Sequence, residues 1–141
     1  MKKIIILPAI LFLSTIISAS GSTLTVTLKN LNPVKGNVMV ALCNSEENFK
    51  EKSEPFKKQK VSVTGSSVKV VFPDLPAGDY AVKVMHDENS NGKFDTNIVG
   101  IPKEAFGFSN DVMGKVGPPK FSQAKVRVDG DKSISITMKK M

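Results

Sequence analysis

The chain has 141 residues, 40% of them hydrophobic, and a formal net charge of +7. This length predicts one domain with a core of its own, and the basic residues are spread along the sequence rather than clustered. With one arginine, one tyrosine and no tryptophan, the chain has few side chains that read bases or stack on them, so we expect no nucleic-acid binding.

The first 20 residues have the pattern of a secretory signal peptide. Two lysines follow Met1, an apolar run extends to residue 17, and three small residues come next. We expect cleavage after Ser20, with Ala19 as the alternative, which leaves residues 21–141 as a single domain. The apolar run is short for a membrane-spanning helix, which needs about 20 apolar residues. The sequence therefore predicts a secreted or periplasmic protein with no transmembrane segment after cleavage.

Most of the remaining chain alternates apolar and polar residues, as half-buried β-strands do. The predicted strands cover 23–29, 37–43, 61–63, 68–72, 80–84, 124–128 and 133–138. The last two flank an Asp-Gly turn and are expected to form a terminal hairpin. Strand 37–43 is apolar on both faces, so one face should enter the core and a long loop should cover the other. Cys43 has no partner for an internal disulfide; we expect it to be buried and free, with an intermolecular disulfide as the alternative.

Residues 44–59 follow the second strand and are dense in glutamate and lysine. A short helical turn in this segment would bury Phe49 and Phe56 over the edge of the sandwich. The count and spacing of the strands, without a long helix, predict an all-β fold. We expect a seven-stranded antiparallel Greek-key sandwich with one long ordered loop.

That loop runs from His86 to Phe121 and does not alternate. It is rich in Gly, Pro and Asn, and connections of more than about a dozen residues without regular structure are usually functional or disordered. Four large apolar residues argue against disorder: Phe94, Ile101, Phe106 and Phe108. We therefore expect a loop that is ordered and that something holds in shape.

The start of the loop has the spacing of a calcium site. Oxygen donors fall on the first, third, fifth, seventh (a main-chain carbonyl) and ninth positions of an EF-hand loop, and glycine falls on the sixth. The donor positions are Asp87, Asn89, Asn91, Lys93 and Asp95.

The match to an EF-hand fails at the twelfth position, where Ile98 replaces the bidentate glutamate, and no flanking helices are apparent. Glu104 is the nearest carboxylate that could fold back to replace it, and Glu88 is the next. With only two carboxylates at matched positions, we expect weak calcium binding, in the ~0.1–1 mM range of extracellular modules. The alternative is a polar turn without metal, because Asp, Asn and Asn-Gly favour turns through local hydrogen bonds.

Three further residues are candidates for ligand binding: His86, Phe106 and Phe108. Continued inward parity along the strand at 80–84 places His86 at the rim of the sandwich. A structural role there, with the ring hydrogen-bonded to the loop backbone, competes with ligand binding. Metal ligation or general-base chemistry by His86 is less favoured, because the sequence offers no second histidine as a ligand and no nucleophile as a partner.

Several motifs resemble a known family. The run LPAGDYAVKV at 75–84 resembles the turn-and-strand signature of transthyretin-like and Cna-B-type sandwich domains. Together with HDENSNGKFD, GIPKEAFGFSN and GPPKF, it resembles the bacterial exported family catalogued as domain of unknown function 2141. The resemblance implies a secreted or periplasmic sandwich, transthyretin- or immunoglobulin-like, with no established activity. Its acidic and amide motif positions fall on Asp87, Asn89, Asn91, Asp95 and Glu104.

Two functions fit these observations. The first is a non-catalytic binding module, a monomer whose calcium-shaped loop presents Phe106 and Phe108 to an envelope protein, a glycan or another cell-surface component. The second is a hydrolase-like periplasmic enzyme that uses His86, Asp87 and Glu104 at the rim. No nucleophile motif accompanies these residues, so the sequence favours the binding module.

Overall fold

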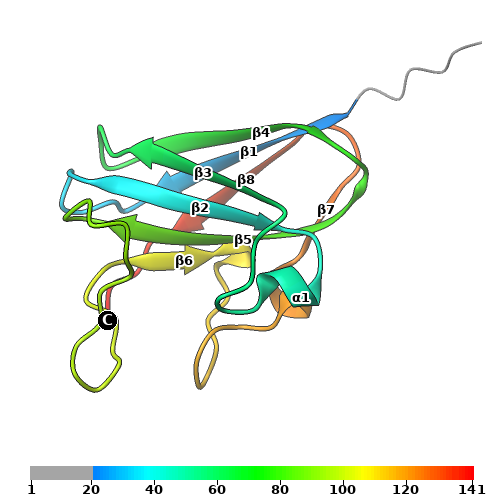
Figure 1. Cartoon of the computed structure of the whole chain (residues 1–141). Helices are drawn as coiled ribbons and strands as arrows, with labels where there is room; N and C mark the ends of the chain where they lie inside the picture. Colours follow the sequence, from blue (N-terminus) through cyan, green and yellow to red (C-terminus); the bar gives the residue numbers. More distant parts are fainter. Residues whose placement is uncertain (1–20) are drawn as a thin grey trace, which may run out of the picture.

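The computed structural model describes residues 21–141, and the predicted signal peptide lies outside the described residues. Eight strands form two sheets that enclose one core, with short helical segments beside them (Figure 1). The strands are β1 (Ser22–Lys29), β2 (Asn37–Cys43), β3 (Lys57–Ser62), β4 (Val68–Leu75), β5 (Gly78–Asp87), β6 (Phe106–Phe108), β7 (Val126–Val128) and β8 (Lys132–Thr137). The helical segments are α1 (Glu46–Phe49), η1 (Ser109–Asp111) and α2 (Phe121–Ala124). Within 21–141 no helix is long and apolar enough to span a membrane.

The all-β prediction is confirmed, but the described chain has eight strands rather than seven. The additional strand is β6, which lies inside the long loop and has only three residues, too few to show alternation. The third strand begins at Lys57 rather than at residue 61. Its first residues are polar on both faces because it lies at the edge of its sheet, so an apolar pattern could not reveal it.

The first sheet has the order β4-β1-β8, and this order corrects the predicted terminal hairpin. Strand β8 pairs with β1 in parallel, whereas β7 pairs with β5 in the other sheet. The Asp-Gly turn between β7 and β8 therefore crosses from one sheet to the other. Two hydrogen bonds fix it to the start of β1: Thr23 N donates to Asp131 Oδ1 at 2.9 Å, and Gly130 N donates to Ser22 Oγ at 2.9 Å.

The core lies between the two sheets, and the residues that alternation predicted to face inward lie in it. The alternate residues Leu24, Val26 and Leu28 of β1 are fully buried, and so is Val82 of β5. One continuous cluster of apolar side chains joins the inward faces of both sheets. Burying such side chains stabilises the fold by about 25 cal/mol per Å² of apolar surface.

The second sheet has the order β3-β2-β5-β6, with β7 paired to the beginning of β5. The segment after β2 forms only the single turn α1, which Ser45 caps by accepting a hydrogen bond from Asn48 N at 3.2 Å. Phe49 on this turn is buried as expected, but Phe56 is 39% exposed because it lies outside the helix. Cys43 is buried and free, as predicted, and burial raises the pKa of its thiol.

Candidate functional site

The outer face of the second sheet carries two cross-strand rows of side chains. Because strand pairing fixes which residues stand opposite each other, the register defines both rows. The first row runs from β3 to β6 through Lys60, Met39, Met85 and Phe106; the second runs through Lys58, Ala41, Lys83 and Phe108. Each row begins with a lysine at the β3 edge and ends with a phenylalanine on β6. The face is thus basic at the β3 edge and, apart from Lys83, apolar across its centre.

A groove of about 1060 Å³ lies over this face. Its floor is the outer face of the sheet, and one wall comes from the segment around Phe94, Ile101 and Pro102. The segment 113–118 and Phe49 of α1 also line it. Figure 1 shows the two loop segments hanging beside β6 on the same side of the molecule. The predicted long loop therefore lies over the second face of β2, as a wall of the groove rather than a closed lid. We call this feature the sheet groove.

A chain of aromatic contacts fixes the β6 end of the sheet groove. Phe94 packs edge-on against Phe106, with ring centroids 6.0 Å apart, and Phe106 packs similarly against Phe108 at 6.1 Å. Phe49 continues the series, 6.2 Å from Phe108 and 6.0 Å from Phe121. Edge-to-face pairs of this kind add about 0.5–1.5 kcal/mol each beyond their buried area. The two phenylalanines predicted to meet a partner are therefore packed into one continuous series of aromatic contacts at this end of the groove.

The polar loop at 87–95 begins with a buried carboxylate. Asp87 lies at the end of β5, where its Oδ1 accepts a hydrogen bond from Asn91 N at 3.1 Å and its Oδ2 accepts one from Gly92 N at 2.7 Å. Gly92 has a φ of +74°, a left-handed conformation that glycine adopts without strain. These two hydrogen bonds hold the backbone of residues 91 and 92 around the Asp87 carboxylate.

Asp95 collects the amides of the same loop. Asn89 Nδ2 donates to Asp95 Oδ2 at 2.8 Å, and Asn91 Nδ2 donates to both carboxylate oxygens at 2.9 and 3.0 Å. These bonds to Asn91 and Asn89 hold the pKa of Asp95 below its usual range. The amide oxygens accept from backbone N–H groups instead. A cation beside Asp95 would therefore require the two amides to turn.

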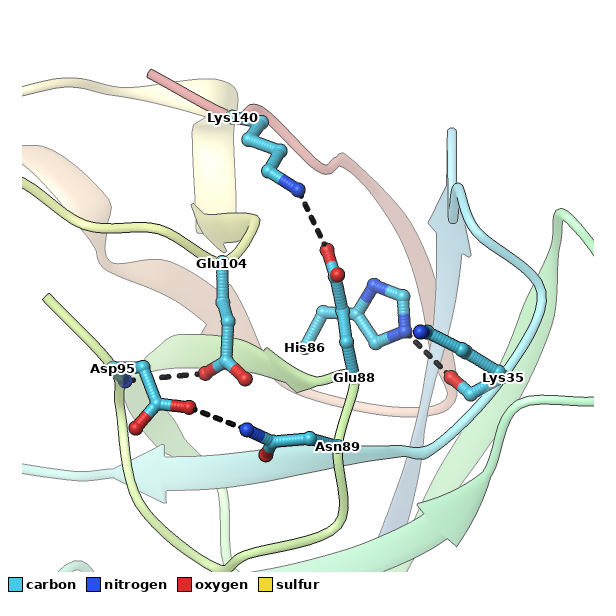
Figure 2. Close-up of polar contacts among 7 residues, drawn as sticks. All are labelled: Lys35, His86, Glu88, Asn89, Asp95, Glu104 and Lys140. Atoms are coloured by element: carbon cyan, nitrogen blue, oxygen red, sulfur yellow. Dashed lines mark hydrogen bonds and ion pairs between the residues drawn. The ribbon is translucent and has the colours of Figure 1, made fainter.

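Glu104 folds back onto this loop, as the sequence suggested for the missing carboxylate. Its Oε2 accepts a hydrogen bond from Asp95 N at 3.2 Å (Figure 2). Burial raises the pKa of Glu104, and the negative charges of Asp95 and Asp87 add to the increase. Glu88, the second candidate, instead forms an ion pair with Lys140 at 3.0 Å. Three carboxylates thus lie around one loop, those of Asp87, Asp95 and Glu104.

Lys93 is the remaining predicted ligand position, through its main-chain carbonyl. Lys93 is exposed, and its backbone N–H donates to Asn91 Oδ1 at 2.9 Å. Among residues 21–141, no group of three or more His, Cys, Asp and Glu side chains is arranged to hold a metal ion. The oxygens that could surround one are those of the three carboxylates, the two asparagine amides and the Lys93 carbonyl.

His86 lies on the other face of β5, away from the sheet groove. Its ring is fully buried, and Nε2 lies 2.8 Å from the carbonyl oxygen of Lys35 (Figure 2). Because a carbonyl can only accept, Nε2 carries the proton. The partner is the loop before β2, not the long loop. His86, Asp87 and Glu104, the residues of the hydrolase hypothesis, are each held by a different backbone segment.

Hydrogen bonds connect the polar loop to the wall of the sheet groove. Lys103 N donates to Asp95 O at 2.9 Å, and Asn97 N donates to Ile101 O at 2.8 Å. The bridge between Thr96 and Pro102 closes the same small hairpin. The position of Ile101 in the groove therefore depends on how the carboxylate cluster is held.

The sequence did not single out Met85, Lys58 or Lys60 as site residues. Its one signal was that strand 37–43 is apolar on both faces, which Met39 and Ala41 produce on the outer side. The rest required the register of β3, β5 and β6, because only pairing brings these residues into rows.

The fold and the groove define a class: an all-β domain of two facing sheets with an apolar groove on the outer face of one. Residues 26–137 match the bacterial family described as "Uncharacterized protein conserved in bacteria (DUF2141)", and the chain belongs to that family. No curated protein and no solved structure matches the chain.

Proposed function

We propose that this protein is an exported, non-catalytic binding module that holds an apolar ligand, or the apolar part of an envelope partner, in the sheet groove. The observation that supports it most is the composition of the outer face. An antiparallel sheet commonly has one face in the core and one polar face in water, whereas here Met39, Met85 and Phe106 form a continuous apolar row. Concave, mostly apolar sites of roughly 300–1,000 Å³ are typical of small-molecule binding.

A neutral solvatochromic dye, Nile red, tests the groove directly. Met85→Glu places a charge in the floor, so we expect it to abolish the fluorescence increase that the wild-type protein gives. Val71→Glu is the matched control, because Val71 is a 45% exposed apolar residue on β4 of the other sheet. Equal dye binding by the wild type and Met85→Glu would show that the groove is not the binding site.

Export is part of the same proposal. It is supported by the charged start, the apolar run and the small residues of the first 20 positions. Expression of the full chain in a bacterium should give a periplasmic or secreted product. Its intact mass should be that of a chain beginning at residue 21, or at residue 20 for the alternative cleavage. A product that stays in the cytoplasm with residues 1–20 attached would refute it.

We also propose that calcium binds weakly at the polar loop and orders the groove wall. The support is the convergence of Asp87, Asp95 and Glu104 on one loop whose hydrogen bonds continue to Ile101. An ion that binds only the folded state stabilises it by about 1.4 kcal/mol at ten times its Kd. Thermal melts with calcium and with chelator test the proposal. An unmoved melting temperature at ~10 mM calcium, ten times the weak end of the extracellular range, would refute it.

A further inference from the structure

The charges around the sheet groove point to a ligand class. Among its lining residues are four lysines and one glutamate: Lys58, Lys60, Lys83, Lys115 and Glu51. Lys58 and Lys60 both belong to the β3 edge, at the opposite end of the rows from Phe106 and Phe108. The groove therefore has a basic end, a centre that is apolar apart from Lys83, and an aromatic end.

Resting on the proposed function, we propose that the ligand is a single-chain anionic amphiphile such as a long-chain carboxylate. Its head group lies at Lys58 and Lys60, and its chain crosses Met39 and Met85 towards Phe106. The rows cross three strand spacings, a path of about 14 Å at ~4.8 Å per spacing. A saturated chain of medium length covers that path.

The two edge lysines are available for an anion. Within residues 21–141 Lys60 forms no ion pair, and Lys58 has one exposed pair, with Glu54 at 3.4 Å. Exposed pairs of this kind contribute little and are easily replaced. Lys83 is different, because its Nζ donates to the carbonyls of Phe49 and Lys50 at 2.9 and 3.3 Å. It anchors α1 to the sheet and is not the anion site.

The apolar lining suits an acyl chain better than a sugar. Methionines at 39, 85 and 113 have flexible side chains that adapt to a mobile chain. Apart from the charged groups, Gln59 and Thr96 are the lining side chains with hydrogen-bonding atoms. A polyhydroxylated ligand would leave most of its hydroxyl groups unpaired here, which costs binding free energy.

Calorimetric titration with monomeric dodecanoate tests the proposal. The double variant Lys58→Gln/Lys60→Gln should weaken dodecanoate binding by about tenfold, the scale of removing two charge contacts. It should leave the binding of neutral Nile red unchanged. The matched control is Lys29→Gln/Lys69→Gln, which removes the same charge from exposed residues of the other sheet and should leave both affinities unchanged.

The outcomes separate this inference from the proposed function. Suppose that Nile red binding depends on Met85 but that the Lys58→Gln/Lys60→Gln variant binds dodecanoate as tightly as the wild type. The proposed ligand class would then be wrong, and the groove would remain the binding site. Loss of dodecanoate affinity in both double variants would show a general charge effect and would also overturn the proposed ligand class. A concentration-dependent dimer that Met85→Glu dissociates would assign the groove to a second copy instead. Binding to phosphatidylglycerol vesicles without binding of monomeric dodecanoate would assign it to a membrane surface.

Discussion

At the residue scale, Asp87 and Asp95 differ in what they do for the polar loop. Asp87 is buried and accepts hydrogen bonds from two backbone N–H groups, so the loop needs its oxygens whether or not an ion is present. Asp95 is half-buried and accepts from two side-chain amides. Its carboxylate is the group most free to exchange those amides for a cation.

We predict that Asp95→Asn abolishes the rise in melting temperature that calcium causes, because it removes a charge from the ninth loop position. At ten times Kd the wild-type rise should be about 5 °C. Asp79 on β5, whose side chain is 42% exposed and faces Lys125 and Arg127 rather than the polar loop, provides the control, and Asp79→Asn should keep the full rise. Asp87→Ala should lower the melting temperature even in chelator. A calcium effect that persists in Asp95→Asn would remove Asp95 from the ion site.

Glu104 predicts a dependence of stability on pH. Burial, followed by repulsion from Asp95 and Asp87, raises its pKa in the folded state, so the folded protein binds this proton more tightly than the unfolded chain does. The free energy of unfolding should therefore fall as pH rises from the ordinary glutamate pKa through the raised folded value, and Glu104 should cause no further change above it.

Glu104→Gln should flatten that fall, because glutamine does not titrate and can still accept the hydrogen bond from Asp95 N. Urea unfolding at several values between about pH 4 and pH 8 measures the profile. Glu54→Gln is the control, since the Glu54 side chain is 84% exposed. Superimposable profiles for Glu104→Gln and the wild type would mean that Glu104 is not the titrating group.

At the element scale, β5 connects the core to the groove. Its inward residue Val82 is fully buried, and Val82 N donates to Ser109 Oγ at 2.9 Å, while Met85 on the other side forms part of the groove floor. Strand β6 is held as tightly, because a Cβ on Gly107 would come within 2.7 Å of the Ile136 side chain. The phenylalanines of β6 therefore project from a strand packed closely against β8.

We predict that Val82→Asp prevents folding. The change places an uncompensated charge in the core, which costs several kcal/mol against a total stability of about 5–15 kcal/mol. Val71→Asp is the matched control at an outward position of β4 and should fold. Circular dichroism and thermal melting measure both variants. A cooperative, unshifted melt for Val82→Asp would contradict the assignment of the inward face.

Local pattern predicted some elements and not others for physical reasons. Strict alternation fixed the inward faces of β1 and β5, because side chains in a strand point to opposite faces with a period of two. Alternation contains no information on partners, so the parallel pairing of β8 with β1 was missed. The sequence named Glu104 as a candidate carboxylate for the polar loop, and its Oε2 does accept from Asp95 N, but ion binding there stays a prediction. The rows of the sheet groove were not predictable, since they depend on the register of four strands.

At the scale of the whole molecule, the two sheets have different outer surfaces. The outward positions of β1 and β8 are mainly threonine, serine and lysine, as expected for a face in water. The outward positions at the centre of the second sheet are apolar apart from Lys83, and two loop segments lie beside β6 on this side of the molecule (Figure 1). This asymmetry is the reason for placing a binding function on one face of the molecule.

Methyl NMR of the mature protein with ¹³C-labelled methionine tests the central claim most directly. Met39, Met85 and Met113 line the groove, whereas Met138 is fully buried in the core and serves as an internal control. On titration with 1-octanol, a neutral apolar ligand, we predict saturable shifts of the Met39, Met85 and Met113 methyl signals and an unmoved Met138 signal; Met141, which also lines the groove, is at the chain end and is not used as a reporter. Octanol binding that shifts Met138 and leaves Met39 and Met85 unchanged would contradict the assignment of the sheet groove as the binding site.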